Sequence, residues 1–256
     1  MALSLNIGKC SILGNYRENN EDSIEVKVFP DMSVCIVADG MGGQAAGEIA
    51  SKRAIEVVPR ELRKNLTASS DLETSRSVLK KSVVQANEEI ITMGSLDRDL
   101  KNMGTTIVTT VWRKGSEMLV SNLGDSRCYL IRDGAIELLT VDHSLAQALV
   151  ENKTISPAEA KEHRFRNVLW KYLGSKEVGE GPDIKVVPVK LGDIFVLCSD
   201  GLSGPCTDQQ ILDFVKAHPD VQECADGLAQ HALDNGSRDN VSAIVIQVVE
   251  GRYRGE

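Results

Sequence analysis

Aspartate residues at the boundaries of apolar runs are the groups in this sequence whose types and spacing could do chemistry. Two of them directly follow an apolar run and are themselves followed by glycine. Carboxylates fixed at strand ends beside glycine form a rigid set of oxygen ligands, and such ligands select hard cations, Mg²⁺ or Mn²⁺, over zinc. Asp39 and Asp200 have this position, a third carboxylate, Asp125, lies between two predicted strands, and a fourth, Asp239, immediately precedes the last apolar strand.

A single Asp-Gly pair is weak evidence for a metal site, because both residues are common in turns. Asp133-Gly134 is interpreted as a turn of this kind. It joins two predicted strands and is typical of a tight antiparallel hairpin. A purely structural turn is also an open alternative for Asp125.

Several other catalytic classes are excluded by their missing motifs. A cysteine-based phosphatase needs an arginine six positions after the cysteine, and none of the six cysteines has one. The nearest approach to the G-x-S-x-G of serine hydrolases, at 201–205, ends in proline. Asp142-His143-Ser144 cannot readily form a catalytic triad, because triad members are assembled in space rather than side by side in sequence. No P-loop or kinase signature is present.

The elements that must position these aspartates follow from hydrophobic periodicity. Short runs rich in β-branched residues predict ten strands, at 3–7, 24–29, 33–38, 105–112, 118–122, 128–132, 137–139, 184–188, 194–198 and 241–249. Helical periodicity and capping signals predict helices at 45–58, at 72–93 with a stop at Gly94, after Ser156, from Thr207 to 215, and at 221–233. Strands and helices come in blocks, which predicts an α+β fold with antiparallel sheets and helices packed outside them.

Length and composition favour one domain that does not bind nucleic acid. The 256 residues contain no linker or low-complexity tract, so we predict a single domain spanning 1–256. The net charge of −8 argues against a nucleic-acid partner. The cysteines form no C-x-x-C pair and are interpreted as reduced core residues. No signal peptide or membrane-spanning stretch is found, which predicts a cytoplasmic location.

Nine short motifs stand in order along almost the whole chain: 14–22, 39–43, 103–106, 124–127, 142–144, 167–169, 173–174, 199–202 and 238–240. On these motifs the sequence resembles the PPM family of metal-dependent serine/threonine protein phosphatases, the 2C class, in its bacterial single-domain form. The resemblance implies a four-layer αββα sandwich of two mainly antiparallel sheets flanked by helices. It also implies that 146–174 is a variable flap beside the active site, which influences substrate choice.

The resemblance further implies the reaction and its metals. Two Mn²⁺ or Mg²⁺ ions would activate a water that hydrolyses phosphoserine and phosphothreonine in proteins without a phosphoenzyme, and bacterial members hold a third, weaker ion. By similarity, Asp39 would bridge the two core ions and the Gly40 carbonyl would bind one of them. Asp200 and Asp239 would complete the other, and Asp125 with Asp200 would hold the third.

Three further residues take roles from the same resemblance. Glu21 and Asp22 match acidic positions that orient metal-bound waters. Arg17 matches the arginine that binds the substrate phosphate, and its planar guanidinium suits two phosphate oxygens. A surface salt bridge is the alternative for Arg17.

One residue departs from the family pattern. Many bacterial relatives carry histidine after the motif at 39–43, whereas this chain has Gln44. A histidine near that site has been proposed to protonate the leaving alkoxide, and glutamine cannot titrate to do so. The departure puts the proton donor in doubt and leaves the metal site intact.

Two alternative functions remain open at this point. One is a catalytically silent relative that binds phosphoproteins as a regulator, and the intact carboxylate set argues against it. The other is a phosphatase that acts on a small phosphorylated metabolite, since a metal site does not itself recognise protein. The predicted partners are phosphorylated proteins, the substrates of a serine/threonine kinase.

Overall fold

The computed structural model describes residues 2–42, 46–67, 69–113, 117–179 and 181–251. Gln44, whose departure from the family pattern concerns the proton donor, lies outside the described residues, and so does Gly43 of the same motif.

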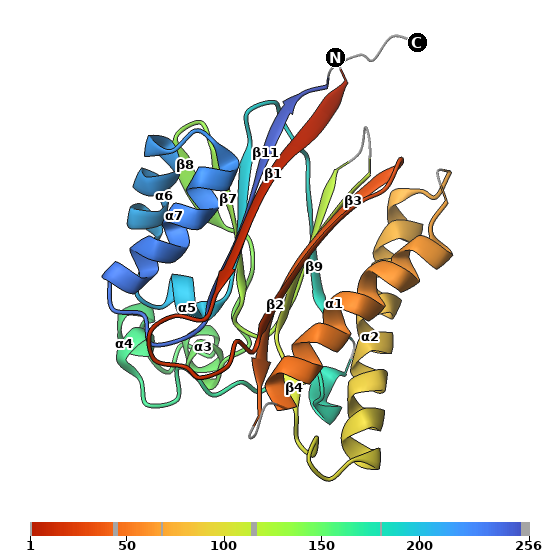
Figure 1. Cartoon of the computed structure of the whole chain (residues 1–256), viewed down its shortest axis with the longest axis vertical. Coiled ribbons are helices and arrows are strands. Elements are labelled where there is room, and N and C mark those ends of the chain that lie inside the picture. The colour runs from red at the N-terminus through yellow and green to blue at the C-terminus, as the bar shows by residue number, and fades with distance from the viewer. Residues whose placement is uncertain (1, 43–45, 68, 114–116, 180, 252–256) are drawn as a thin grey trace.

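Two antiparallel β-sheets form the centre of the molecule (Figure 1). The first has the strand order β1 (Leu3–Ile12), β11 (Val241–Glu250), β10 (Ile194–Cys198), β7 (Arg127–Arg132) and β8 (Ala135–Leu138). The second has the order β2 (Asp22–Val28), β3 (Met32–Met41), β5 (Ile107–Arg113), β6 (Met118–Leu123) and β9 (Asp183–Val187), and the short β4 (Gly104–Thr105) also pairs with β3.

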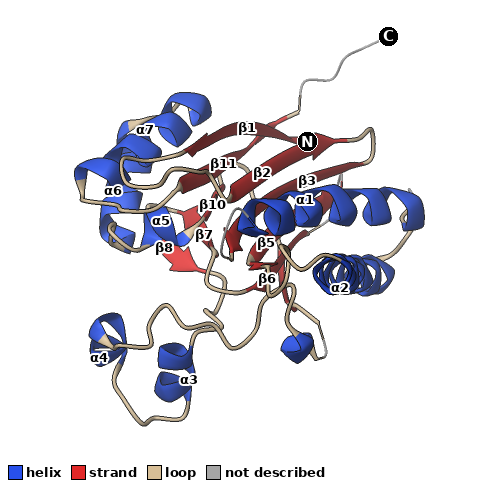
Figure 2. Ribbon diagram, turned by 60° about the horizontal axis from the view of Figure 1, so that its bottom comes forward, coloured by secondary structure: helices blue, strands red, loops and turns tan. Residues whose placement is uncertain are grey.

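Helices cover the outer face of each sheet (Figures 1 and 2). The second sheet is covered by α1 (Ala46–Asn65) and α2 (Leu72–Leu96). The first sheet is covered by α5 (Asp200–Ser203), α6 (Asp208–Ala217) and α7 (Val221–Asp234). Two helices of the predicted flap, α3 (Leu145–Glu151) and α4 (Pro157–Glu162), lie away from both sheets, and a 3₁₀ turn follows at Lys176–Val178. The predicted α+β class and the arrangement of two antiparallel sheets with flanking helices are confirmed.

The strand β3 shows why an uninterrupted apolar run is a strand here. Val34 and Ile36 point into the core shared with α1 and α2, while Cys35 and Val37 point into the core between the two sheets. Because side chains alternate between the two faces of a strand, both faces must be apolar when both are covered. The strand was predicted to end at 38, but it continues to Met41, because Asp39 pairs with Asp22 of β2, and Gly40 and Met41 pair with β4.

The hairpin predicted at Asp133-Gly134 is confirmed. The strands β7 and β8 pair in register, with Arg132 opposite Ala135. Asp133 and Gly134 have φ values of 51° and 79°, as expected for a two-residue turn with both residues in the left-handed region.

Two helix boundaries were predicted wrongly. The stop predicted at Gly94 is wrong, because α2 continues to Leu96, and the Asp97 N–H then donates to the Met93 carbonyl. The helix predicted to end at 58 continues through Pro59 to Asn65. Leu62, on this last part of α1, is fully buried, so the packing of the apolar face outweighs the local cost of proline.

Two short helices were not predicted, α3 and α5. The four-residue α5 begins at Asp200 itself, so this carboxylate sits in the first turn of a helix rather than in a loop. In the described part of the chain, none of the helices is long and apolar enough to span a membrane. All six cysteines are free thiols, and five of them are buried.

Candidate metal centre

The aspartates selected from the sequence converge at one end of the two sheets. Asp22 starts β2 and stands opposite Asp39, which lies near the end of β3. In the other sheet, β10 and β11 are neighbours. Asp200 follows β10, and Asp239 precedes β11. Asp125 lies in the turn between β6 and β7, which belong to different sheets. Residues far apart in sequence are therefore brought into one cluster.

The backbone of Asp39 is held at three points by two threonines. Its N–H donates to Thr106 Oγ1 at 3.0 Å, and its carbonyl accepts from the Thr106 N–H at 2.8 Å and from Thr105 Oγ1 at 2.9 Å. These bonds engage only the backbone of Asp39, so its carboxyl group remains available to the cluster. They also fix the direction in which it projects from the sheet end.

Asp22 is buried beneath the cluster, with 7% of its surface exposed. Ser199 Oγ donates to Asp22 Oδ2 at 2.8 Å, which connects β2 to the end of β10. Burial and the charges of Asp200 and Asp239 raise the pKa of Asp22 to about 7. Hydrogen bonds from two serines act in the opposite direction, and their effect is smaller. Asp22 is therefore a buried neighbour of Asp39 and not a residue that faces solvent.

The cluster is electrostatically strained in the absence of a cation. Burial, followed by the charges of the four other aspartates, holds the pKa of Asp39 well above its ordinary value. Burial and the neighbouring charges of Asp200 and Asp142 raise the pKa of Asp125 to about 8. The pKa of Asp200 is also raised by burial and by Asp239, although a hydrogen bond donated by the Asp39 carboxyl lowers it. Negative charge collected in this way is stabilised by a multivalent cation.

Two glycines are required by the close approach of backbone segments around the cluster. A Cβ on Gly40 would lie 2.2 Å from the Gly47 carbonyl oxygen and 2.5 Å from that of Glu21. A Cβ on Gly201 would lie 1.8 Å from the carbonyl oxygen of Asn240. The glycines after Asp39 and Asp200 therefore have a packing reason beyond turn formation.

Asn240 braces the two loops that border the site, and the sequence prediction missed it. Its Oδ1 accepts from the Glu21 N–H at 2.9 Å, and its Nδ2 donates to the carbonyls of Leu13 at 2.9 Å and Asn19 at 3.1 Å. The signal that could have found it is its place in the motif at 238–240. Ser199 and Thr106, which hold Asp22 and Asp39, also belong to quoted motifs.

Arg17 reaches the cluster from the loop between β1 and β2. Its Nη2 donates to Asp239 Oδ2 at 2.7 Å, with 47% of the Arg17 side chain and 34% of the Asp239 side chain exposed. This hydrogen bond raises the pKa of Arg17. The Glu21 side chain lies against Gly47, because a Cβ on Gly47 would be 2.7 Å from Glu21 Oε1. Burial raises the pKa of Glu21 although Arg17 opposes this.

The donor set fits a hard cation, but the side chains are not arranged as closed ligand shells. Among the described residues, no three His, Cys, Asp or Glu side chains are placed so that they could hold a metal ion between them. Mg²⁺ commonly takes only one or two carboxylates and keeps several waters, so the carboxylates and backbone oxygens present are chemically sufficient. Asp239 would have to exchange its bond to Arg17 for a metal ion.

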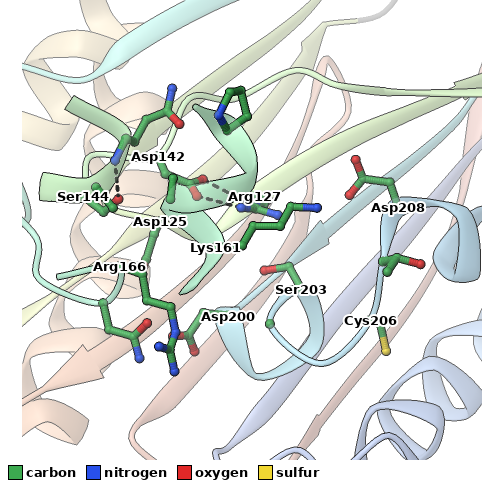
Figure 3. Close-up of a pocket in the computed structure, with 17 residues that line it drawn as sticks. Asp125, Arg127, Asp142, Ser144, Lys161, Arg166, Asp200, Ser203, Cys206 and Asp208 are labelled. Carbon is green, nitrogen blue, oxygen red and sulfur yellow. Dashed lines mark hydrogen bonds and ion pairs between the residues drawn. The ribbon is translucent and has the colours of Figure 1, made fainter. Parts of the chain in front are cut away.

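A cavity of about 380 Å³ opens beside the cluster (Figure 3). Asp125 and Asp200 line it on the side of the carboxylates. The flap lines it with Lys161 and Arg166, and the start of α6 lines it with Asp208. The cavity therefore joins the flap helices to the candidate metal centre.

The three residues Asp142, His143 and Ser144 have separate partners. Asp142 accepts two bonds from Arg127, at 3.0 and 2.7 Å. His143 Nδ1 accepts from the Gly124 N–H at 3.0 Å, which fixes the residue before Asp125. Ser144 caps α3. His143 Nε2 lies 3.3 Å from Asp183 Oδ2, but in the described part of the chain Ser144 has no hydrogen bond to His143, so the three adjacent residues form no catalytic triad, as expected from the sequence.

Comparisons with known proteins agree with this geometry. A sequence profile of the family described as protein phosphatase 2C matches residues 16–241. The chain is 34% identical over 235 residues to the serine/threonine phosphatase stp of Listeria welshimeri, covering 91% of this chain and 92% of the relative. It is 37% identical over 243 residues to the serine/threonine protein phosphatase PstP of Mycobacterium tuberculosis, covering 94% of this chain and 44% of the relative.

Solved structures show the same likeness in three dimensions. The catalytic domain of PstP in complex with two manganese ions superposes with a TM-score of 0.83 at 35% identity, covering 97% of this chain and 100% of that one. The serine/threonine phosphatase Stp1 from Staphylococcus aureus gives a TM-score of 0.87 at 29% identity, covering 97% of this chain and 96% of that one.

Proposed function

This chain belongs to the protein phosphatase 2C family, and from that premise we propose how its residues carry out the reaction. The chain is a metal-dependent serine/threonine protein phosphatase. The observation that carries the assignment of roles is the convergence of Asp39, Asp125, Asp200 and Asp239 at one end of the two sheets.

Asp39 is proposed to hold both core ions, with the Gly40 carbonyl binding one of them. Asp200 and Asp239 would bind the other ion, and Asp125 with Asp200 would hold a third. Bound ions would supply an activated water that attacks phosphorus directly, so no phosphoenzyme is formed. The raised pKa values of Asp39, Asp125 and Asp200 support these roles, because a cation relieves the repulsion that causes them.

Arg17 is proposed to bind the phosphate of the substrate. Its guanidinium already reaches the edge of the cluster and is half exposed, so a phosphate can approach it from solvent. When a cation takes Asp239, the guanidinium is released to hold two phosphate oxygens. The salt bridge seen here and the phosphate-binding role are then two states of one side chain.

Glu21 and Asp22 are proposed to orient water rather than to bind the ions directly. Asp22 is supported in this role by its burial behind Asp39 and its bond from Ser199. Glu21 is supported by its place beside Gly47 and Gly40, close to the backbone that follows Asp39. Such outer groups fix the ligands and tune the metal affinity.

The whole chain is proposed to act as one catalytic domain in the cytoplasm. Residues 146–174 would form a flap that helps to choose among phosphorylated protein substrates. The cavity supports this role, since it lies between flap residues and the carboxylates. The substrates would be products of a serine/threonine kinase.

The deciding experiment measures phosphate release from p-nitrophenyl phosphate and from a phosphothreonine peptide with Mn²⁺, with Mg²⁺ and with chelator. Metal-dependent turnover of both substrates, lost in Asp39→Ala and Asp200→Ala, is expected. A folded protein without turnover in either metal would instead point to a silent phosphoprotein-binding module. Turnover of phosphorylated metabolites with no activity on phosphopeptides would point to a metabolite phosphatase.

A further inference from the structure

A guanidinium lies over an exposed aromatic ring at the rim of the carboxylate cluster, and we call these two side chains the stacked pair. The Arg238 guanidinium carbon lies 5.5 Å from the centroid of the Tyr16 ring. Tyr16 is 64% exposed, and Arg238 is also exposed. Among the described residues, Arg238 has no carboxylate partner, so the ring is what positions its charge. A cation held over a ring keeps its N–H donors available for another group.

The stacked pair stands directly beside the proposed phosphate-binding arginine. Tyr16 precedes Arg17 and Arg238 precedes Asp239, and Arg17 and Asp239 are themselves joined at 2.7 Å. The loop that carries Tyr16 and Arg17 therefore meets the loop that carries Arg238 and Asp239 at both of these positions. A phosphate held by Arg17 would have the Arg238 guanidinium as a neighbouring cation.

The two loops are held together firmly enough to present a fixed surface. Asn240 donates to the carbonyls of Leu13 and Asn19, on either side of Tyr16. Gly14 has a φ of 77°, and a Cβ there would lie 2.5 Å from the Asp239 carbonyl oxygen. Ordering in advance reduces the entropy lost when a ligand binds.

The charge of the surroundings indicates what this surface would bind. The cluster below it is made of aspartates, and the chain carries a net charge of −8. An acidic group on a substrate is repelled by such surroundings unless a cation receives it. The cavity on the flap side is lined by neither Tyr16 nor Arg238, so the stacked pair is a separate contact region.

We propose that Tyr16 and Arg238 form a subsite for an anionic group next to the phosphorylated residue of the substrate. The group is a carboxylate side chain or a second phosphate, which share the chemistry that a guanidinium recognises. This inference rests on the proposed function, because it assumes that Arg17 holds the phosphate to be removed. It identifies the preferred substrates as phosphopeptides with acidic or further phosphorylated neighbours.

The test compares kcat/KM for three phosphothreonine peptides of one sequence. The residues flanking the phosphothreonine are asparagine in the first, aspartate in the second and phosphoserine on one side in the third. The wild type is expected to prefer the second and third peptides about fivefold over the first. Arg238→Gln should abolish that preference, and Arg238→Lys, which keeps the charge without the planar guanidinium, should retain part of it.

Two further variants separate the subsite from a general charge effect. Tyr16→Ala should weaken the preference, whereas Tyr16→Phe, which keeps the ring, should retain it. Arg76→Gln removes an exposed arginine that is paired with Glu73 on α2, and it should leave the preference as in the wild type. A preference for only the second or only the third peptide would identify the carboxylate or the phosphate as the source of the anion.

The inference is overturned if the wild type hydrolyses all three peptides equally, or if Arg238→Gln keeps the preference. Failure of the proposed function looks different, because the wild type would then hydrolyse neither the peptides nor p-nitrophenyl phosphate. That second result removes the basis of the subsite as well.

Discussion

Arg17 Nη2 lies 2.7 Å from Asp239 Oδ2 and joins two residues that are 222 positions apart in the chain. The contact places a cationic side chain on a carboxylate that the proposed mechanism assigns to a metal ion. Arginine and metal therefore compete for Asp239. The Arg17 side chain is about half exposed and the Asp239 side chain about one third exposed, so solvent screening weakens the ion pair and a divalent cation can displace it.

Removing the Arg17 guanidinium should show whether it binds the substrate phosphate or forms only the salt bridge with Asp239. In Arg17→Ala we expect KM for a phosphothreonine peptide to rise about tenfold, since a charge-assisted phosphate contact is lost. Binding of Mn²⁺, measured by calorimetry without substrate, should be unchanged or tighter, because Asp239 loses its competitor. Arg63→Ala, which removes an exposed pairing with Asp31, serves as the control and should alter neither quantity. An unchanged KM in Arg17→Ala would favour the surface salt bridge over phosphate binding.

The carboxylate cluster can be tested by stability as well as by activity. Asp39→Asn and Asp200→Asn should abolish turnover and also the rise in melting temperature that Mn²⁺ causes in the wild type. Asp133→Asn is the matched control, because Asp133 occupies a left-handed turn position with φ 51° that asparagine also tolerates. Retention of a wild-type Mn²⁺ shift in Asp39→Asn would rule out its bridging role.

The sheets were largely predictable because their signal is local. Each buried strand, such as β3, has apolar residues on both faces, and Asp133-Gly134 defines its hairpin through backbone geometry alone. The errors have another origin. The extension of α1 through Pro59 depends on the packing of the buried Leu62, which overrides the local preference of proline. The extension of α2 past Gly94 is only two residues, Leu96 is exposed, and the helix ends with a local bond from the Asp97 N–H to the Met93 carbonyl.

The candidate site was predictable as a set of residues and not as an arrangement. The position of each aspartate beside an apolar run was visible in the sequence, and the family resemblance supplied roles. The convergence of Asp125 with Asp239 depends on how strands from both sheets end at one place. The supporting bonds of Asn240 and the stacking of Tyr16 with Arg238 join distant loops, and no local pattern reports such contacts.

The metal-free protein should lose stability as the pH rises. In the unfolded chain, aspartates release their protons near about pH 4. In the folded chain, burial raises the pKa of Asp22 to about 7 and that of Asp125 to about 8. The folded state therefore binds more protons between these limits, and the free energy of unfolding falls as the pH rises through that window.

Urea unfolding at several pH values, with chelator and with Mn²⁺, checks this dependence. Mn²⁺ should reverse the slope, since a bound cation favours the charged carboxylates and competes with protons. Asp22→Asn should flatten the slope in chelator, because it removes one of the titrating groups. A metal-free protein whose stability rises steadily from about pH 5 to about pH 8 would contradict the strained cluster.

The close approach at Gly201 should make this position intolerant of a side chain. A Cβ there would lie 1.8 Å from the Asn240 carbonyl oxygen, so Gly201→Ala should lower the free energy of unfolding by about 3 kcal/mol. Gly192→Ala is the comparison, because Gly192 has a φ of 88° and open space around it, so only about 1 kcal/mol of backbone strain is expected. Equal losses in the two variants would mean that the backbone around Gly201 can yield to a Cβ, and that the close approach to Asn240 does not require glycine at this position.

Gln44 should limit the enzyme most on substrates with poor leaving groups. Glutamine cannot donate a proton to a departing alkoxide, whereas an aryl phosphate releases a phenolate that needs little protonation. The wild type should therefore be less impaired on p-nitrophenyl phosphate than on a phosphoserine peptide. Gln44→His should raise kcat for the peptide about tenfold and change kcat for the aryl phosphate much less.

The pH profile of Gln44→His distinguishes a proton donor from a change in packing. An imidazolium donates only while it is protonated, so the gain on the peptide should fade as the pH rises above about 6.5. Gln44→Asn, which introduces no titrating group, should give no gain at any pH. If Gln44→His raised both activities equally, or by the same factor at every pH, the residue at this position would act on something other than leaving-group protonation.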